Sequence, residues 1–185
     1  MIEEIKTEAE DHMKKALEAL DHAFNHIRTG RANPSILDEV MVSYYGNDTP
    51  INQVANINVE DGRTLAISPW EKQMVPEIEK AIMKSDLGLN PATSGDTIRI
   101  AMPLLTEETR KELVKHAKSD AERGRVSIRN QRRDANAAIK DLLKEKEISE
   151  DEARHEEDLI QKMTDAYIAK VESKLTEKES DLMKV

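Results

Sequence analysis

One continuous helical pattern, from its candidate N-cap Thr106 to about Lys146, constrains the fold of this chain more than any other feature. Apolar residues recur along it at helical spacing, so at about 100° per residue they form a single stripe. A helix of this length extends about 60 Å. No such helix is stable alone, so the stripe must pack against other long helices. Its members are Leu113, Val114, Ala117, Ala121, Ile128, Ala135, Ala138, Ile139, Leu142 and Leu143.

Two further stretches have the same periodicity, residues 2–29 and residues 149–182. Gly30 follows the first as a candidate C-terminal cap. Ser149 and Glu152 have the spacing of a capping box at the start of the last. With only 3% aromatic and 35% charged residues, the composition suits long amphipathic helices better than a sandwich or barrel. The sequence therefore predicts an elongated three-helix bundle.

The pattern changes between the first two helices, because all six prolines and five of the six glycines fall between Gly30 and Pro103. We expect an inserted domain over residues 31–103, with the bundle formed by residues 1–30 and 104–185. The predicted fold class is α+β, a three-helix bundle with a small β/α/β insertion. Within the insertion we expect a strand around 40–44, two strands at 54–59 and 64–68 joined by a tight turn, a short helix at 71–86 and a strand at 97–101.

Five arginines and no carboxylate lie between Arg123 and Arg133. Arg125, Arg129, Arg132 and Arg133 fall on one side of the helix, beside the apolar stripe. Most charge runs are simply solvated faces. This run, however, has one sign within a chain whose formal net charge is -9, and guanidinium groups contact phosphate in a bidentate manner. We interpret it as a local surface for the phosphates of a nucleic acid.

Other classes of site have little support. The absence of cysteine excludes disulfides and thiolate metal sites. No glycine-rich phosphate loop and no recognisable catalytic constellation is present, so we expect no enzyme activity and no cofactor. His22 and His26 have i, i+4 spacing on the predicted first helix, but no third ligand accompanies them and we expect no metal site. Tyr44, Tyr45 and Trp70 could stack on bases, although such residues more often occupy core or turn positions.

The start of the chain lacks the basic and apolar regions of a secretory signal. No apolar run approaches the roughly 20 residues that are needed to cross a bilayer. We expect a soluble, cytoplasmic protein with no membrane partner.

Six short sequence motifs are distinctive: IRTGRA at 27–32, YYG at 44–46, SDLGLNP at 85–91, LTEE at 105–108, RNQRRDAN at 129–136 and KEISED at 146–151. In this order and spacing they closely resemble the bacterial ribosome recycling factor family, over essentially the whole chain. The resemblance implies a near-parallel three-helix bundle with an inserted β/α/β domain, arranged as an L of roughly transfer-RNA outline. It also implies a role after translation termination, when such a factor acts with elongation factor G and that partner's GTP hydrolysis to split the ribosome and free messenger and deacylated transfer RNA.

The resemblance also implies particular residues and partners. The partners are the ribosome, through its large-subunit RNA, and elongation factor G, and we expect a monomer. Two residues depart from the family's usual pattern: Thr109 stands where another basic residue is frequent, and Gly124 where alanine is usual. The ribosomal-RNA contacts of the family match Arg28, Arg31, Arg110, Arg129, Arg132 and Arg133.

The two chain crossings between the predicted domains are candidates for a hinge, because each contains residues that end regular structure. If the resemblance is set aside, the alternative is an elongated helical adaptor or chaperone that binds proteins through its acidic outer helices. Salt-dependent co-sedimentation with ribosomes separates the two interpretations. The expected hinge residues are Thr29, Gly30, Arg31, Ala32, Met102, Pro103, Leu104 and Leu105.

Overall fold

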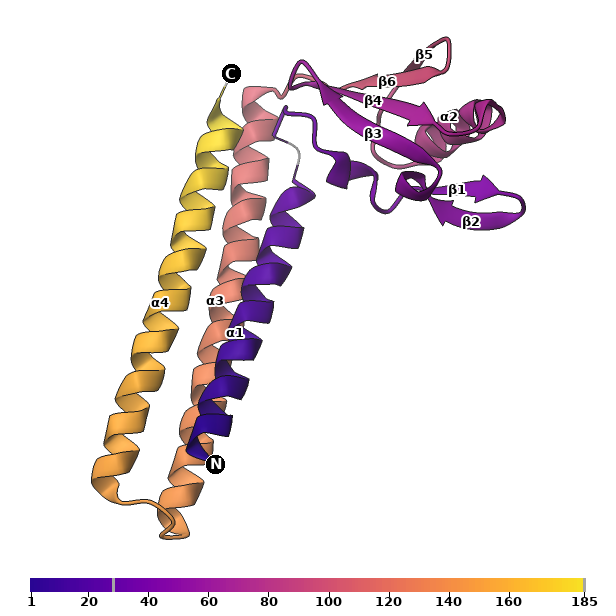
Figure 1. The fold of residues 1–185 in the computed structure, drawn as a ribbon. Helices are drawn as coiled ribbons and strands as arrows, with labels where there is room; N and C mark the ends of the chain where they lie inside the picture. Colours follow the sequence, from indigo (N-terminus) through magenta and orange to yellow (C-terminus); the bar gives the residue numbers. More distant parts are fainter. Residues whose placement is uncertain (28, 185) are drawn as a thin grey trace. The chain divides into compact units, whose positions relative to one another are not determined.

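The computed structural model describes residues 1–27 and 29–184, which form two compact units (Figure 1). One unit comprises Met1–Phe24 and Lys111–Val185, and the other comprises Asn25–Arg110. The second unit is therefore inserted in the sequence of the first. These divisions lie a few residues away from the expected boundaries after 30 and before 104, and which residues act as the crossings stays a prediction.

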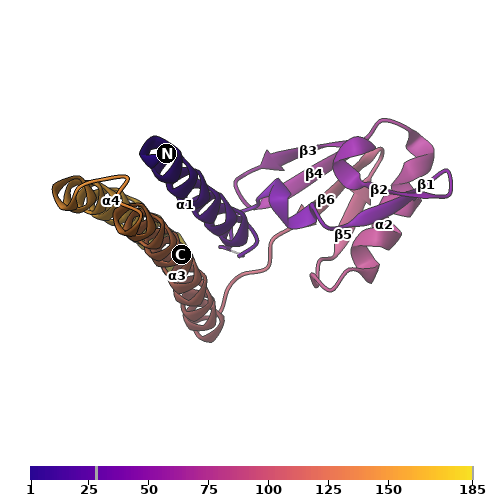
Figure 2. The same ribbon diagram turned by 90° about the horizontal axis from the view of Figure 1, so that it is seen from below.

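The first unit is a bundle of three long helices, which confirms the predicted fold class. The middle helix α3 runs antiparallel to α1 and α4 (Figures 1 and 2). Six residues of the predicted α3 stripe are buried, among them Ala121, Ile128 and Ile139, and the other four are half-buried. The helices are α1 (Ile2–Asn25), α3 (Glu107–Lys144) and α4 (Glu150–Met183).

Both predicted N-caps of the long helices are present. The backbone N–H of Thr109 donates to Oγ1 of Thr106 at 3.1 Å at the start of α3. At the start of α4, Glu152 N donates to Ser149 Oγ at 3.2 Å, and Ser149 N donates to Glu152 Oε2 at 2.9 Å. These reciprocal bonds satisfy backbone donors that have no partner within the helix.

The predicted end of the first helix is wrong, because α1 stops at Asn25. Gly30 has a φ of +79°, as a helix-ending glycine often has, but it lies five residues beyond the last helical residue. The intervening segment includes β-branched Ile27 and Thr29, which gain little from a helical conformation. His26 consequently follows the helix, and the expectation that it shares α1 with His22 is corrected.

The second unit contains a four-stranded antiparallel sheet of order β3-β4-β6-β5 and a separate β1–β2 hairpin. The turn between β3 and β4 is the predicted one, with Asp61 and Gly62 both at positive φ. The strands are β1 (Met41–Tyr44), β2 (Asn47–Pro50), β3 (Ala55–Glu60), β4 (Thr64–Pro69), β5 (Pro91–Ser94) and β6 (Thr97–Ala101).

Helix α2 (Val75–Lys84) packs against the sheet and closes the core of the second unit. Ile78 and Ile82 of the helix are fully buried, as are Ile67 of β4 and Ile98 of β6. The helix begins later than the predicted residue 71, because Pro76 suits its first turn. Short 3₁₀ turns complete the unit: η1 (Pro34–Leu37), η2 (Ile51–Gln53) and η3 (Lys72–Met74).

Candidate nucleic-acid interface

The structure places the predicted arginines on more than one element. Arg129, Arg132 and Arg133 lie within little more than one turn of α3, in the bundle. Arg110 lies in the first turn of the same helix, roughly five turns earlier, and Arg31 lies in the second unit. Arg28 lies outside the described residues. The structure thus brings three of the six predicted contact residues together on one helical surface.

Arg125 is held between α3 and α4 by two carboxylates. Its Nε donates to Glu172 of α4, and its Nη1 lies 2.7 Å from Glu122 Oε2, one turn earlier on α3. The side chain is only 16% exposed. The hydrogen bond with Glu172 raises the pKa of Arg125 above its ordinary value, although burial acts in the opposite direction. The positive charge of Arg125 is therefore compensated within the protein. Arg125 adds less positive charge to the surface than its place in the arginine run indicates.

Arg129 and Arg132 have weaker partners. Nη1 of Arg129 lies 3.5 Å from Glu122 Oε1, and its side chain is 41% exposed. An ion pair of this length and exposure contributes little to stability, so Glu122 holds Arg129 only weakly. Nη1 of Arg132 donates at 3.4 Å to Oε1 of Gln161 on α4, which is a neutral group. A neutral amide positions the guanidinium without cancelling its charge.

Within the described part of the chain no ion pair compensates Arg132 or the exposed Arg133, so these two provide the strongest positive charge that this part of α3 offers to a phosphate. At the start of the arginine run, Arg123 has a carboxylate partner: its Nη1 lies 3.7 Å from Oδ1 of the buried Asp120. We name the surface formed by Arg129, Arg132 and Arg133 the arginine flank.

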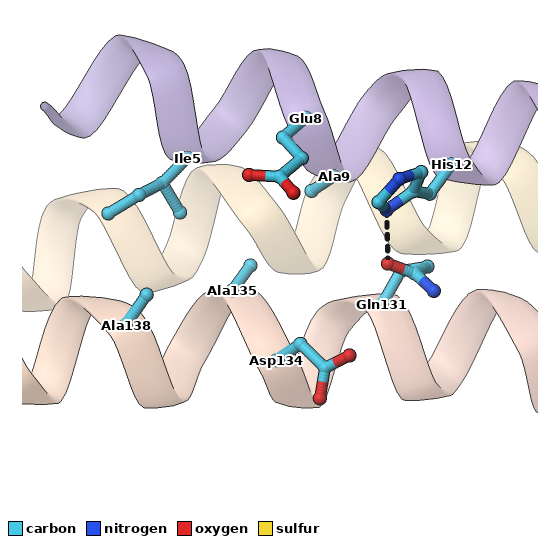
Figure 3. Close-up of a pocket in the computed structure, with 8 residues that line it drawn as sticks. All are labelled: Ile5, Glu8, Ala9, His12, Gln131, Asp134, Ala135 and Ala138. Carbon is cyan, nitrogen blue, oxygen red and sulfur yellow. Dashed lines mark hydrogen bonds between the residues drawn. The ribbon is translucent and has the colours of Figure 1, made fainter.

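The neighbouring residue Gln131 faces the other side of α3, toward α1 (Figure 3). Nδ1 of His12 lies 2.8 Å from Oε1 of Gln131, across a shallow groove. The groove encloses about 250 Å³, which is less than the roughly 300–1,000 Å³ typical of ligand pockets. The contact between His12 and Gln131 joins α1 to α3. It is lined by Ile5, Glu8, Ala9, His12, Gln131, Asp134, Ala135 and Ala138.

Two of the expected hinge residues, Ala32 and Met102, are hydrogen-bonded to the β3–β4 turn. The N–H of Ala32 donates to the carbonyl of Gly62 at 2.9 Å, and the N–H of Met102 donates to the carbonyl of Arg63 at 2.8 Å. Two segments that are seventy residues apart in the sequence are thereby attached to the same turn. A Cβ atom placed on Gly30 would lie 4.0 Å from Cδ1 of Leu105, so the two crossings also approach each other there.

The described residues contain neither a metal site nor a membrane-spanning helix. No group of three or more His, Cys, Asp or Glu side chains is placed to hold a metal ion within residues 1–27 and 29–184. In the same part of the chain, no helix is long and apolar enough to cross a membrane.

Known proteins resemble this chain along its whole length. The family model described as "Ribosome recycling factor" matches residues 20–183. The chain belongs to the ribosome recycling factor family. Relatives named ribosome-recycling factor are 67% identical in Hahella chejuensis and 64% identical in a Marinomonas species, over 100% of both chains in each case.

Two solved structures of ribosome recycling factors share the fold. The first, a solution structure, has a TM-score of 0.78 and 42% identity and covers 100% of this chain and 98% of its own. The second has a TM-score of 0.70 and 46% identity over 100% of both chains. Its title describes models of the T. thermophilus ribosome recycling factor and the E. coli elongation factor G bound to the E. coli post-termination complex.

The departures from the usual ribosome recycling factor pattern have simple structural settings. Thr109 is half-buried and accepts a hydrogen bond from the Thr106 hydroxyl at 2.8 Å, within the N-terminal turn of α3. Gly124 is buried, and a Cβ added there would lie 3.8 Å from Leu20 Cδ2 and 3.9 Å from Val171 Cγ2. Both distances are ordinary van der Waals contacts, so an alanine fits at this position.

Sequence reasoning missed the residues that set the charge of the arginine flank. Glu122 lies one position before the arginine run, and Glu172 and Gln161 lie far along the chain, on α4. A search for carboxylates three or four residues from each arginine would have found Glu122. No local pattern indicates which residues of α4 face Arg125 and Arg132.

Proposed function

We propose that this chain recycles ribosomes after translation termination, as a cytoplasmic monomer. It would bind the post-termination ribosome and, with elongation factor G, split the subunits and release messenger and deacylated transfer RNA. The observation that carries the proposal is the 67% identity to a ribosome-recycling factor over the whole of both chains. The solved structure whose title places a ribosome recycling factor with elongation factor G on a post-termination complex supports the choice of partner.

The protein is anchored to large-subunit ribosomal RNA through Arg28, Arg31, Arg110, Arg129, Arg132 and Arg133, of which the last three lie in the bundle. The arginine flank supports this assignment, because a neutral partner holds Arg132 and leaves its charge available to a phosphate. The remainder of the chain is acidic, with a formal net charge of -9, which disfavours indiscriminate binding to nucleic acid. Affinity then depends on a small local surface.

The protein acts without catalysing a reaction of its own, and GTP is hydrolysed by the partner. Movement between the two units transmits the partner's motion to the anchored bundle. The hydrogen bonds of Ala32 and Met102 to the β3–β4 turn attach these residues to the second unit. Of the expected hinge residues, Thr29, Gly30 and Arg31 on one crossing and Pro103, Leu104 and Leu105 on the other are therefore the ones that change conformation.

The decisive experiment measures subunit splitting by light scattering on post-termination ribosomes. Splitting is expected only when this protein, elongation factor G and GTP are all present, and not when a non-hydrolysable GTP analogue replaces GTP. Co-sedimentation of the protein alone with large subunits should weaken steeply as salt rises. An adaptor or chaperone would instead bind ribosomes weakly at every salt concentration and leave the subunits joined, which would refute the proposal.

A further inference from the structure

Charge is distributed unequally among the three helices of the bundle. Helix α3 carries eleven Lys and Arg residues against seven Asp and Glu residues. The same comparison gives three against seven in α1 and five against eleven in α4. The positive charge of this acidic chain is therefore concentrated on one helix of the bundle, and the arginine flank is only part of it.

Two lysines near the C-terminal end of α3 continue the line of the arginine flank. Lys140 follows Arg133 by seven residues, which is about two turns, and Lys144 follows Lys140 by four. Both lysines therefore lie on the same side of the helix as Arg129 and Arg133. These four residues extend about 23 Å along the helix axis. We name them the cationic stripe.

The cationic stripe faces away from both neighbouring helices. Gln131 contacts His12 of α1, and Arg132 contacts Gln161 of α4, which marks the two packed sides of α3. At about 100° per residue, the stripe lies outside the arc between these two contacts. Its three members after Arg129 are exposed. The stripe is thus open to a ligand along its length.

No carboxylate neutralises the two lysines. Within residues 1–27 and 29–184, neither Lys140 nor Lys144 forms an ion pair. Asp134, which lies between Arg133 and Lys140 in the sequence, lines the groove toward α1 instead (Figure 3). Asp141 has the i, i+3 spacing to pair with Lys144, but these described side chains do not form an ion pair.

The cationic stripe does not favour the helix that carries it. Arg129 with Arg133, and Lys140 with Lys144, are i, i+4 pairs of like charge, which destabilise a helix. Lys144 gains from its place in the last turn, because a cation there interacts favourably with the helix dipole. Lys140 lies a full turn earlier and has no comparable benefit. A phosphate placed between two such cations would remove their repulsion.

We infer that Lys140 and Lys144 are further phosphate-binding residues, which extend the RNA surface from the arginine flank to the end of α3. The inference rests on the proposed function and adds the length and direction of the site. An RNA backbone fits the stripe because its charges repeat along a line, and about 23 Å spans several nucleotides. Lysine is a point charge on a flexible stem, so the two lysines attract the backbone while the arginines position it.

The first test compares double variants of the full-length chain, by co-sedimentation with purified large ribosomal subunits across a salt series. Lys140→Gln combined with Lys144→Gln should weaken binding about tenfold, because two phosphate contacts are lost. The slope of log affinity against log salt should fall by about 1.4–1.8 units. Restoring the charges as Lys140→Arg with Lys144→Arg should restore both the affinity and the slope.

The matched control is Lys15→Gln combined with Lys162→Gln. It removes the same charge from exposed positions on α1 and α4, and it should leave the salt slope close to that of the parent. The thermal unfolding midpoint of the Lys140 and Lys144 variant should not fall below that of the parent, because a repulsive pair is removed. Weaker binding with an unchanged midpoint assigns the loss to the contact and not to the fold.

A second test identifies what lies over the stripe. The chain has no cysteine, so Ala137→Cys provides a single attachment point for a short photo-crosslinker on exposed α3 surface, between Arg133 and Lys140. Ala166→Cys, at an exposed position of α4, is the control. On large subunits, the crosslinker at position 137 should attach to ribosomal RNA, and the one at position 166 should give little RNA adduct.

Two results would overturn the inference. One is an equal loss of affinity in the Lys140 and Lys144 variant and in its control, and the other is attachment at position 137 to ribosomal protein instead of RNA. Arg132→Ala in the same salt series separates this failure from that of the proposed function. A loss with Arg132→Ala alone confines the site to the arginine flank, whereas a parent protein that does not bind large subunits refutes both.

Discussion

The arginines of α3 differ chiefly in what compensates their charge. Two carboxylates compensate Arg125, one distant carboxylate reaches Arg129, and Arg132 contacts a neutral amide. Because phosphate binding requires that any internal partner be displaced first, residues with similar sequence contexts are expected to contribute unequally. The order of contribution should be Arg132 above Arg129 above Arg125.

Replacing Arg132 with alanine should weaken binding to the large ribosomal subunit by about 1–3 kcal/mol. The slope of log affinity against log salt should also fall by a little under one unit. Helix content should not change, because the side chain lies outside the buried stripe. Arg125→Ala is the matched control and should change affinity much less. Equal losses in the two variants, measured by co-sedimentation across a salt series, would contradict the proposed order.

Replacing Glu122 with glutamine should strengthen binding to the large subunit. Glu122 is 2.7 Å from Arg125 and 3.5 Å from Arg129, so its charge competes with any phosphate for these groups. The expected gain is at most about 1 kcal/mol, since the Glu122 side chain is 55% exposed. Glu145→Gln, which removes the same charge near the end of α3, controls for net charge. Equal affinities of the two variants would show that Glu122 does not regulate the flank.

Gly124→Ala should stabilise the protein. Glycine in a helix costs about 1 kcal/mol relative to alanine, and the added methyl group would make ordinary contacts with Leu20 and Val171. We expect the free energy of unfolding, measured in urea, to rise by about 1 kcal/mol. A decrease would mean that the three helices approach too closely for a methyl group at this position.

At the scale of single elements, the long helices depend on their caps because each must begin at a defined residue to bring its apolar stripe into register. The capping box of α4 comes directly after the loop that follows α3. It sets the residue at which α4 starts. Short strands are different, since β2 (Asn47–Pro50) and β5 (Pro91–Ser94) have little apolar alternation and depend on pairing with β1 and β6.

Ser149→Ala should lower the free energy of unfolding by about 1 kcal/mol. The hydroxyl accepts from Glu152 N, and its loss leaves one N-terminal donor of α4 without a partner in the protein. Ser149→Asp should restore most of the loss, because aspartate is also a good N-cap. Affinity for ribosomes should be unchanged in both variants, because Ser149 lies twelve residues before Gln161, the α4 residue that contacts the arginine flank. A failure of aspartate to rescue stability in a urea titration would show that the cap is not the cause.

At the scale of the whole molecule, the bundle and the inserted unit each have a hydrophobic core of their own. Two chain crossings join them, and the second unit retains Ala32 and Met102 through hydrogen bonds to a single turn. A double connection of this kind permits bending but limits free rotation. The proposed function requires this bending, because the bundle is anchored while the partner moves.

A disulfide engineered between the two units should therefore preserve binding to ribosomes and block subunit splitting. The absence of native cysteine makes the design clean, because a pair of introduced cysteines has no competing thiol. Each single-cysteine parent serves as a control, and reduction should restore splitting. If the oxidised, fully crosslinked protein splits ribosomes with elongation factor G at the uncrosslinked rate, bending between the units is not needed.

Features that depend on neighbours within a few turns could be predicted from the residues alone. The period of the apolar residues predicted the three-helix bundle, the spacing of Ser149 and Glu152 predicted the capping box, and the run around Arg132 predicted a positive surface. The end of α1 was beyond such reasoning, because periodic apolar residues continue to Ile27 while the helix stops at Asn25. The partners of the α3 arginines could be learned only from the folded chain, since Glu172 and Gln161 reach Arg125 and Arg132 from another helix. The tertiary structure also decided where the polar strands β2 and β5 form, because their backbone hydrogen bonds are made with other strands and leave no apolar pattern in their own residues.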